Sequence, residues 1–143
     1  MTALAHTSTL IATTQVAVGG AVGAAARYQL GRGLTAWLGP QAMTAFPWAT
    51  LAANVLGGLA MGVLAGWLMQ RSGSAAGAAS DSWRLLIGVG LLGGFTTFSS
   101  FSLETMLLIE RGQAWTAMTY VLVSVLACLA ALYIGLIATR LAA

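Results

Sequence analysis

The sequence has very little charge. Six basic and three acidic side chains make up 6% of its 143 residues, whereas 59% are hydrophobic. With a mean hydropathy of +0.88, the chain lies far outside the composition of soluble domains. The hydrocarbon core of a bilayer is about 30 Å thick and needs roughly 20 apolar residues per helical span. We therefore expect an all-α integral membrane protein with four transmembrane helices and no soluble domain.

Lysine is absent, and cysteine occurs once. All six cations are arginines, a pattern typical of side chains flanking membrane spans and not of a basic nucleic-acid-binding surface. We therefore expect no nucleic-acid partner. The lone Cys128 lies inside an apolar run, which excludes an intramolecular disulfide and a multi-cysteine metal site.

The apolar runs predict a single transmembrane domain over residues 1–143. Gly39-Pro40 predicts a loop after the first span, and the Gly-, Ala- and Ser-rich residues 72–82 predict the longest flexible loop. The four expected spans cover residues 10–34, 47–69, 83–109 and 115–138.

The third span contains an unusual centre. Two glycines and two threonines occupy residues 93, 94, 96 and 97, and glycine is a poor residue for a helix interior. We expect the helix to break near residues 93–97. Irregular backbone at bilayer depth is tolerated only where protein or a cavity covers it, so the break should face a partner.

The arginines are evenly divided between the two sides of the membrane. With four spans, one side holds Arg71, Arg84 and Arg140, and the other holds Arg27, Arg32 and Arg111. The positive-inside rule then has no preference, so we expect insertion in both orientations and an antiparallel, inverted homodimer. Coincidence among only six charges is the alternative.

Other polar and small residues fall on helical faces. Gly58, Gly62 and Gly66 repeat every four residues and predict close helix packing. Thr50 and Asn54 share a mid-span face, where polar side chains mark either an interhelical hydrogen bond or an ion path.

Two further sets of side chains share a helical face. Phe98 and Phe101 lie three residues apart, which is usually core packing but would also present two rings to a common path. Tyr120, Ser124 and Cys128 form a stripe spaced by four in the last span.

Two charged residues are candidates for a vestibule or a gate. Arg27, at the end of the first expected span, would draw anions, whereas Glu104 would repel them unless it is paired or protonated. Salt bridges at helix ends are the alternative for both.

The run Gly93-Gly94-Phe95-Thr96-Thr97-Phe98-Ser99-Ser100-Phe101, together with Asn54 and Arg27-Tyr28, resembles the fluoride-specific channel family called Fluc or CrcB. The match extends over all four spans and includes Thr50, Tyr120 and Ser124. The chain departs from the family pattern at Cys128, where a hydroxyl is common, and at Ser100, where threonine is common.

The resemblance implies a channel, not an enzyme, in the cell (inner) membrane as a multi-pass homodimer. Fluoride would leave the cell passively, lowering its toxicity. The resemblance makes Phe98 and Phe101 the pore phenylalanines, with Asn54, Thr50, Tyr120 and Ser124 as polar residues along the path. It also implies a structural, untransported sodium ion on the main-chain oxygens of Gly93 and Thr96.

Two other functions fit a small four-helix membrane protein. A small multidrug exporter is also short and often inserts in both orientations, but such exporters resemble one another in a glutamate on the first helix, and here the first span has no acid. A non-transporting assembly subunit would use its mid-span polar residues only to join helices.

Overall fold

The computed structural model describes residues 2–71 and 81–142, with side chains from residue 9 onward in these ranges. The described residues form helices and no strand. The elements are α1 (Thr2–Ala45), α2 (Trp48–Arg71), the π-helix η1 (Arg84–Leu92), α4 (Gly93–Phe95), α5 (Phe98–Glu110) and α6 (Ala114–Leu141). The predicted loop at residues 72–82 lies, apart from Asp81 and Ser82, outside the described residues.

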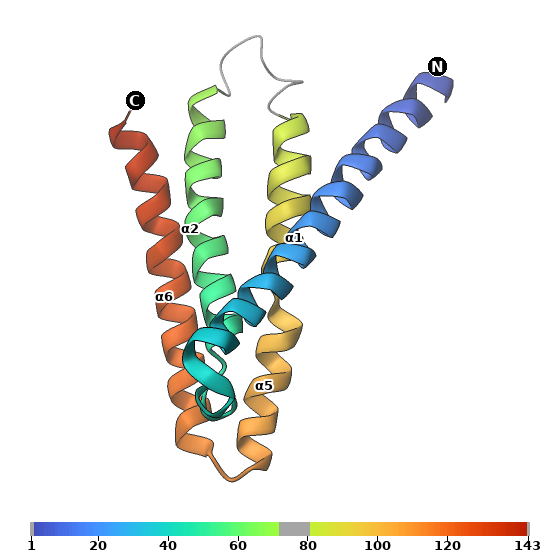
Figure 1. Ribbon diagram of the computed structural model, residues 1–143. Helices are drawn as coiled ribbons and strands as arrows, with labels where there is room; N and C mark the ends of the chain where they lie inside the picture. Colours follow the sequence, from blue (N-terminus) through green and yellow to red (C-terminus); the bar gives the residue numbers. More distant parts are fainter. Residues whose placement is uncertain (1, 72–80, 143) are drawn as a thin grey trace.

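Four helical stretches are long and apolar enough to cross a membrane, as the hydropathy predicted. They are Thr9–Ala45, Trp48–Arg71, Asp81–Glu110 and Ala114–Leu141. Both chain ends lie at one end of the bundle, and the α1–α2 connection and the α5–α6 hairpin lie at the other (Figure 1). The all-α membrane fold with four spans is therefore confirmed.

The first helix is longer than the expected 10–34 because nothing between Leu34 and Gly39 stops it. Gly39 interrupts it with φ 82° and ψ 158°, a conformation that glycine adopts without steric cost. The expected loop is therefore a kink: Pro40 starts a last short stretch that ends at Ala45, and proline suits the first turn of a helix because its missing N–H has no helical partner there.

The glycine series on α2 packs against α6, as its spacing predicted. A Cβ added at Gly62 would collide with the main chain of Leu132, and one at Gly135 would collide with that of Leu59. The two backbones therefore run in direct contact. Such close approach favours helix association in a bilayer, where apolar burial against lipid contributes little.

The third span breaks two residues after the glycines. Gly93 and Gly94 are helical, whereas Thr96 (φ −82°, ψ 158°) and Thr97 (φ −153°, ψ 118°) are extended. The break near 93–97 is thus confirmed, but Gly94 has a role other than breaking the helix. A Cβ at Gly94 would collide with the Gly20 carbonyl of α1, so Gly94 lets α1 pack against the break.

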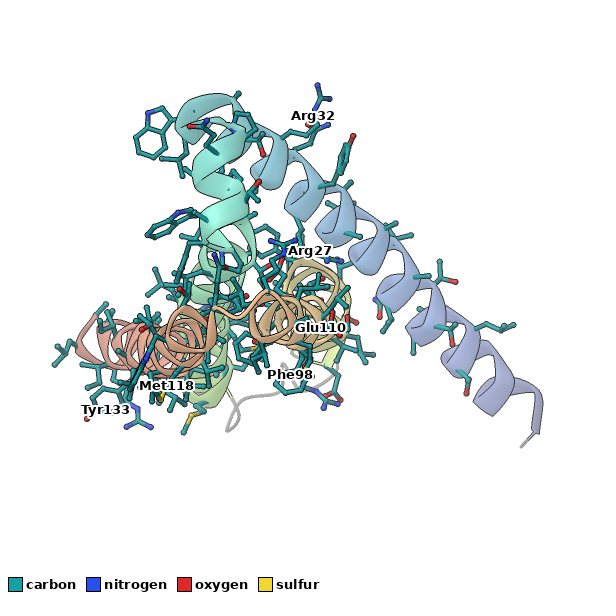
Figure 2. The ribbon with its side chains drawn as sticks, turned by 90° about the horizontal axis from the view of Figure 1, so that it is seen from below. Arg27, Arg32, Phe98, Glu110, Met118 and Tyr133 are labelled. Atoms are coloured by element: carbon teal, nitrogen blue, oxygen red, sulfur yellow. The ribbon has the colours of Figure 1, made fainter. Side chains whose placement is uncertain are left out.

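The N-terminal end of α1 projects away from the other helices (Figure 1; Figure 2), whereas Gln15, Val16 and Gly19 already contact η1 at Gly90. A small core of Leu108, Ala117 and Tyr120, with Phe46 and Phe101 against it, closes the hairpin end. Most other large apolar side chains are exposed. Such a surface suits lipid or a second copy of the chain.

Candidate functional site

Asn54 on α2 holds the broken backbone. Its Oδ1 accepts a hydrogen bond from the Thr97 N–H at 2.8 Å, and its Nδ2 donates to the Thr97 carbonyl at 3.1 Å. One side-chain amide thus satisfies both main-chain polar groups of an extended residue at bilayer depth, where an unpaired group would cost several kcal/mol. Asn54 therefore fastens the break to α2.

The break also frees carbonyls from their usual helical donors, among them those of Gly93 and Thr96. The Thr97 N–H would bond to Gly93 in a helix but donates to Asn54 instead, and the Ser100 N–H, the helical partner of the Thr96 carbonyl, donates to Thr97 Oγ1 at 3.2 Å. Thr97 is the N-cap of α5, a position that favours threonine. The two oxygens predicted to hold sodium are therefore among the carbonyls that lose their helical donors, and the sodium site stays a prediction.

An open groove of about 360 Å³ adjoins the break between α2, α5 and α6. Its polar lining comes from Asn54, Thr96, Thr97 and Ser124. Ser124 is 4% exposed, and its Oγ has no hydrogen-bond partner among the described residues. A buried hydroxyl without a partner is rare, so this donor is available to a group that occupies the groove.

The two predicted pore phenylalanines lie at the same groove. Phe98 and Phe101 both line it, with ring centroids 5.6 Å apart at an interplanar angle of 41°. Phe98 is 78% exposed, whereas Phe101 packs on Tyr120 at 5.1 Å between centroids. Figure 2 shows Phe98 projecting from the bundle on the side away from Arg27.

Three other predicted site residues form a separate cluster. Glu104 on α5 accepts hydrogen bonds from Thr50 Oγ1 and from the Tyr120 hydroxyl, each at 2.8 Å. Thr50 and Tyr120 are buried, and neither lines the groove beside the break. Both hydroxyl protons point at a carboxylate, so an anion would have to compete with Glu104 for them.

Glu104 also faces a second hollow. This hollow, of about 280 Å³, lies at the hairpin end and includes Thr44 and Arg111 in its wall. The predicted path residues thus fall into two groups, and the Phe101–Tyr120 ring contact is where these groups meet. The sequence spacing alone had placed Tyr120 and Ser124 on one continuous stripe.

Arg27 lies beside the break in the third span, and not at the membrane surface to which the charge count had assigned it. Its Nε donates to the Gly94 carbonyl at 3.3 Å, beside the break, and Figure 2 shows it turned toward the bundle, with Arg32 turned outward. The two sides then keep three and two flanking arginines, a balance still within one charge. Insertion in both orientations stays a prediction.

Sequence reasoning did not find the roles of Thr97 and Arg27. Thr97 and Ser100 lie three residues apart at a helix start, which is the spacing of an N-cap and its main-chain donor. That signal was present in the sequence. Nothing in the sequence indicated the Arg27–Gly94 contact, because it joins residues 67 positions apart.

The third membrane span is broken, held by an amide and flanked by an open groove with a free hydroxyl. These are features of an ion-conducting site in a multi-pass membrane protein. The sequence profile of the CrcB-like proteins (Camphor Resistance, CrcB) matches residues 14–136. The chain belongs to this family.

Curated relatives extend the match over nearly the whole chain. A protein of Erythrobacter litoralis is 58% identical over 92% of this chain and 94% of its own length. A Novosphingobium aromaticivorans protein is 51% identical over 89% and 94%, and a Phenylobacterium zucineum protein 52% over 87% and 92%. Each of these relatives is named fluoride-specific ion channel FluC.

Proposed function

We propose that this protein is a fluoride-selective channel of the cell membrane that lets fluoride leave the cell passively and so lowers its toxicity. The observation that carries the proposal is the groove at the break, where the free Ser124 hydroxyl lies with Phe98 and Phe101. The names of the relatives support the choice of ion. As a channel, the protein would catalyse no reaction.

The chemistry of the groove suits a small anion that has lost its water. Fluoride binds its hydration shell strongly, so a selective path must replace water with several short donors. Ser124 offers an O–H, and aromatic rings are positive at their edges, so Phe98 and Phe101 would stabilise the anion weakly. Neutral donors of this kind bind well enough for entry and weakly enough for exit.

The Glu104 cluster would act at the hairpin end of the path. Thr50 and Tyr120 can donate to fluoride only when one of them releases the carboxylate. In this exchange the hydroxyl donates to fluoride in place of the carboxylate, so one anionic acceptor replaces another. The free-energy cost is therefore smaller than that of leaving the hydroxyl without any acceptor. Arg27 would not draw anions into a vestibule, because its guanidinium is held at the Gly94 carbonyl.

An inverted homodimer would complete the site. Phe98, Met118 and Tyr133 are all exposed and project on one side of the bundle (Figure 2), and the groove is open. A second copy on this side would cover the apolar surface and close the groove into a path. The family likeness implies two such paths in each dimer.

A structural sodium ion fits the break. Sodium is a hard cation that prefers oxygen ligands, and the Gly93 and Thr96 carbonyls have lost their helical donors. A second copy would bring two more such carbonyls. Bound there, sodium would hold the two breaks together without being transported.

Membrane potential alone would drive the flow. A negative-inside potential is worth about 2.3 kcal/mol per charge per 100 mV, which expels an anion without coupling to another ion. A small multidrug exporter would instead need an acid on its first helix, and α1 has none among residues 9–45.

Fluoride efflux from liposomes tests the proposal. Vesicles with the purified protein should lose fluoride when potassium and valinomycin compensate charge, with no proton gradient, and should retain chloride. Efflux no faster than from empty vesicles would reject the channel and favour the non-transporting assembly subunit. Efflux that stops when the proton gradient collapses would favour an exporter.

The sodium site has its own test. Replacing sodium on both sides by N-methylglucamine should weaken the dimer and reduce efflux. If dimer and efflux both persist, the assignment of Gly93 and Thr96 is wrong, whatever the result for fluoride.

A further inference from the structure

The groove beside the break also carries two sulfur atoms that the fluoride path does not use. Met61 on α2 and Cys128 on α6 both line it, and both are partly buried. They come from helices in direct contact, since a Cβ added at Gly58 would lie 3.0 Å from the Cys128 carbonyl oxygen. Met61 follows Gly58 by three residues, so it lies about one turn along α2 from this contact.

A second observation points to a ligand at the same place. Ser124 precedes Cys128 by four residues and so lies one turn away on the same face of α6. Its Oγ is buried and has no hydrogen-bond partner among the described residues. An occupant of the groove, or a water molecule bound to that occupant, would satisfy this oxygen.

The lining decides which kind of occupant fits. None of the twelve residues that line the groove is Asp, Glu or His, so calcium and magnesium lack carboxylate ligands there, and zinc lacks the imidazole or carboxylate ligands that would accompany a single thiolate. A thiolate and a thioether instead select soft metals, above all monovalent copper and its analogue silver. The thioether of methionine is polarizable and adapts to irregular spaces.

We propose that Cys128 and Met61 form a binding site for a soft monovalent metal ion, and that the bound ion blocks the groove. The Cys128 S–H bond breaks, its proton leaves to water, and a metal–sulfur bond forms with no change of oxidation state. Met61 adds a neutral sulfur ligand, and the Ser124 oxygen faces the metal or its water. The blocking effect, though not the metal site, rests on the proposed fluoride path.

Silver is the practical probe because its fluoride is soluble. Purified wild-type protein is titrated with silver nitrate by calorimetry, and fluoride efflux from liposomes is measured over the same silver concentrations in chloride-free sodium nitrate. Block is expressed as a fraction of each variant's own rate without silver. The variants are C128S and M61L, and M69L serves as a control because Met69 is exposed at the other end of α2.

We expect one tight silver ion per chain and a matching loss of efflux. C128S should raise the half-blocking silver concentration by at least about 100-fold, M61L by about 10-fold, and M69L not at all, since even the loss of an outer-shell partner of a metal ligand costs about 10- to 100-fold in affinity. Protein that elutes as the same oligomer in all variants excludes misfolding as the cause.

Three results would overturn the proposal. C128S could bind silver as tightly as the wild type, M61L could behave like M69L, or silver could saturate Cys128 while efflux continues. If the protein shows no efflux even without silver, the fluoride function fails, whereas the calorimetric comparison of C128S, M61L and M69L still decides the metal site.

Discussion

The two halves of α2 attach to their neighbours in different ways. Near its start, Thr50 and Asn54 make hydrogen bonds to Glu104 and Thr97 of the third span. Further along, Gly62 and its neighbours approach α6 until the backbones touch. One half recognises its partner by donors and acceptors, and the other half by shape.

The two kinds of contact contribute to the groove in different ways. In a bilayer, close packing and hydrogen bonds hold helices together because lipid is as apolar as the side chains. The glycine contact sets the distance between α2 and α6. The polar contacts then hold the break at a fixed place beside the groove, so the groove depends on both halves.

The largest effect should come from breaking the glycine contact. Gly62→Leu puts a side chain where the Leu132 main chain lies, and overpacking of this kind should destabilise the fold by about 3 kcal/mol or more. Gly33→Leu is the matched control, since a Cβ there meets nothing within 4 Å. Unfolding in mixed micelles measures both, and equal stability of the two variants would contradict the packing described here.

A somewhat smaller effect should follow from removing the amide that holds the break. Asn54→Leu leaves the Thr97 N–H and carbonyl without their partner, which should cost about 2–3 kcal/mol. Hydrogen exchange at the start of α5 should also rise. Gln29→Leu, at an exposed position of α1, should change neither quantity, and protection of α5 that survives in Asn54→Leu would refute the role of Asn54.

Tyr120→Phe tests the carboxylate cluster. It removes the hydroxyl that donates to Glu104 but keeps the ring between Phe46 and Phe101. A hydrogen bond to a charged group is worth about 2 kcal/mol, so thermal unfolding should shift down and fluoride efflux should fall. Tyr133→Phe is the control, since Tyr133 is 62% exposed. Identical melting of both variants would mean that the cluster contributes nothing.

The smallest effect should be at the helix cap. Thr97→Ala removes the side-chain oxygen that accepts from the Ser100 N–H but leaves the main-chain bonds to Asn54, so the loss should be about 1 kcal/mol. Thr97→Ser keeps the hydroxyl and should restore most of it. A serine variant as unstable as the alanine variant would show that packing of the threonine methyl group matters more than the cap.

The parts predictable from the sequence were those governed by local rules. Hydropathy gave the four spans, and the four-residue spacing of Gly58, Gly62 and Gly66 gave a packing face. The break was expected from its glycines, yet the extended residues are Thr96 and Thr97. The role of Gly94 could not be predicted, because its close contact with Gly20 of α1 depends on tertiary structure.

The arrangement of the site was harder to predict. Thr50, Asn54, Tyr120 and Ser124 have the same helical spacing, and spacing says nothing about which neighbour each side chain meets. The hydroxyls of Thr50 and Tyr120 donate to Glu104 and do not line the groove, whereas the Ser124 hydroxyl lines it and has no partner among the described residues. A charged acceptor from another helix decides the difference, and only the folded chain shows it.

The most direct test of the groove as the fluoride path is efflux through the phenylalanine variants. Phe98→Ile and Phe101→Ile remove the ring edges at the groove, whereas Leu103→Ile, at an exposed position of the same helix, leaves the groove intact. Measured in liposomes with equal protein content, both phenylalanine variants should lose most fluoride efflux and Leu103→Ile should keep it. Full efflux through both phenylalanine variants would contradict the assignment of this groove as the path.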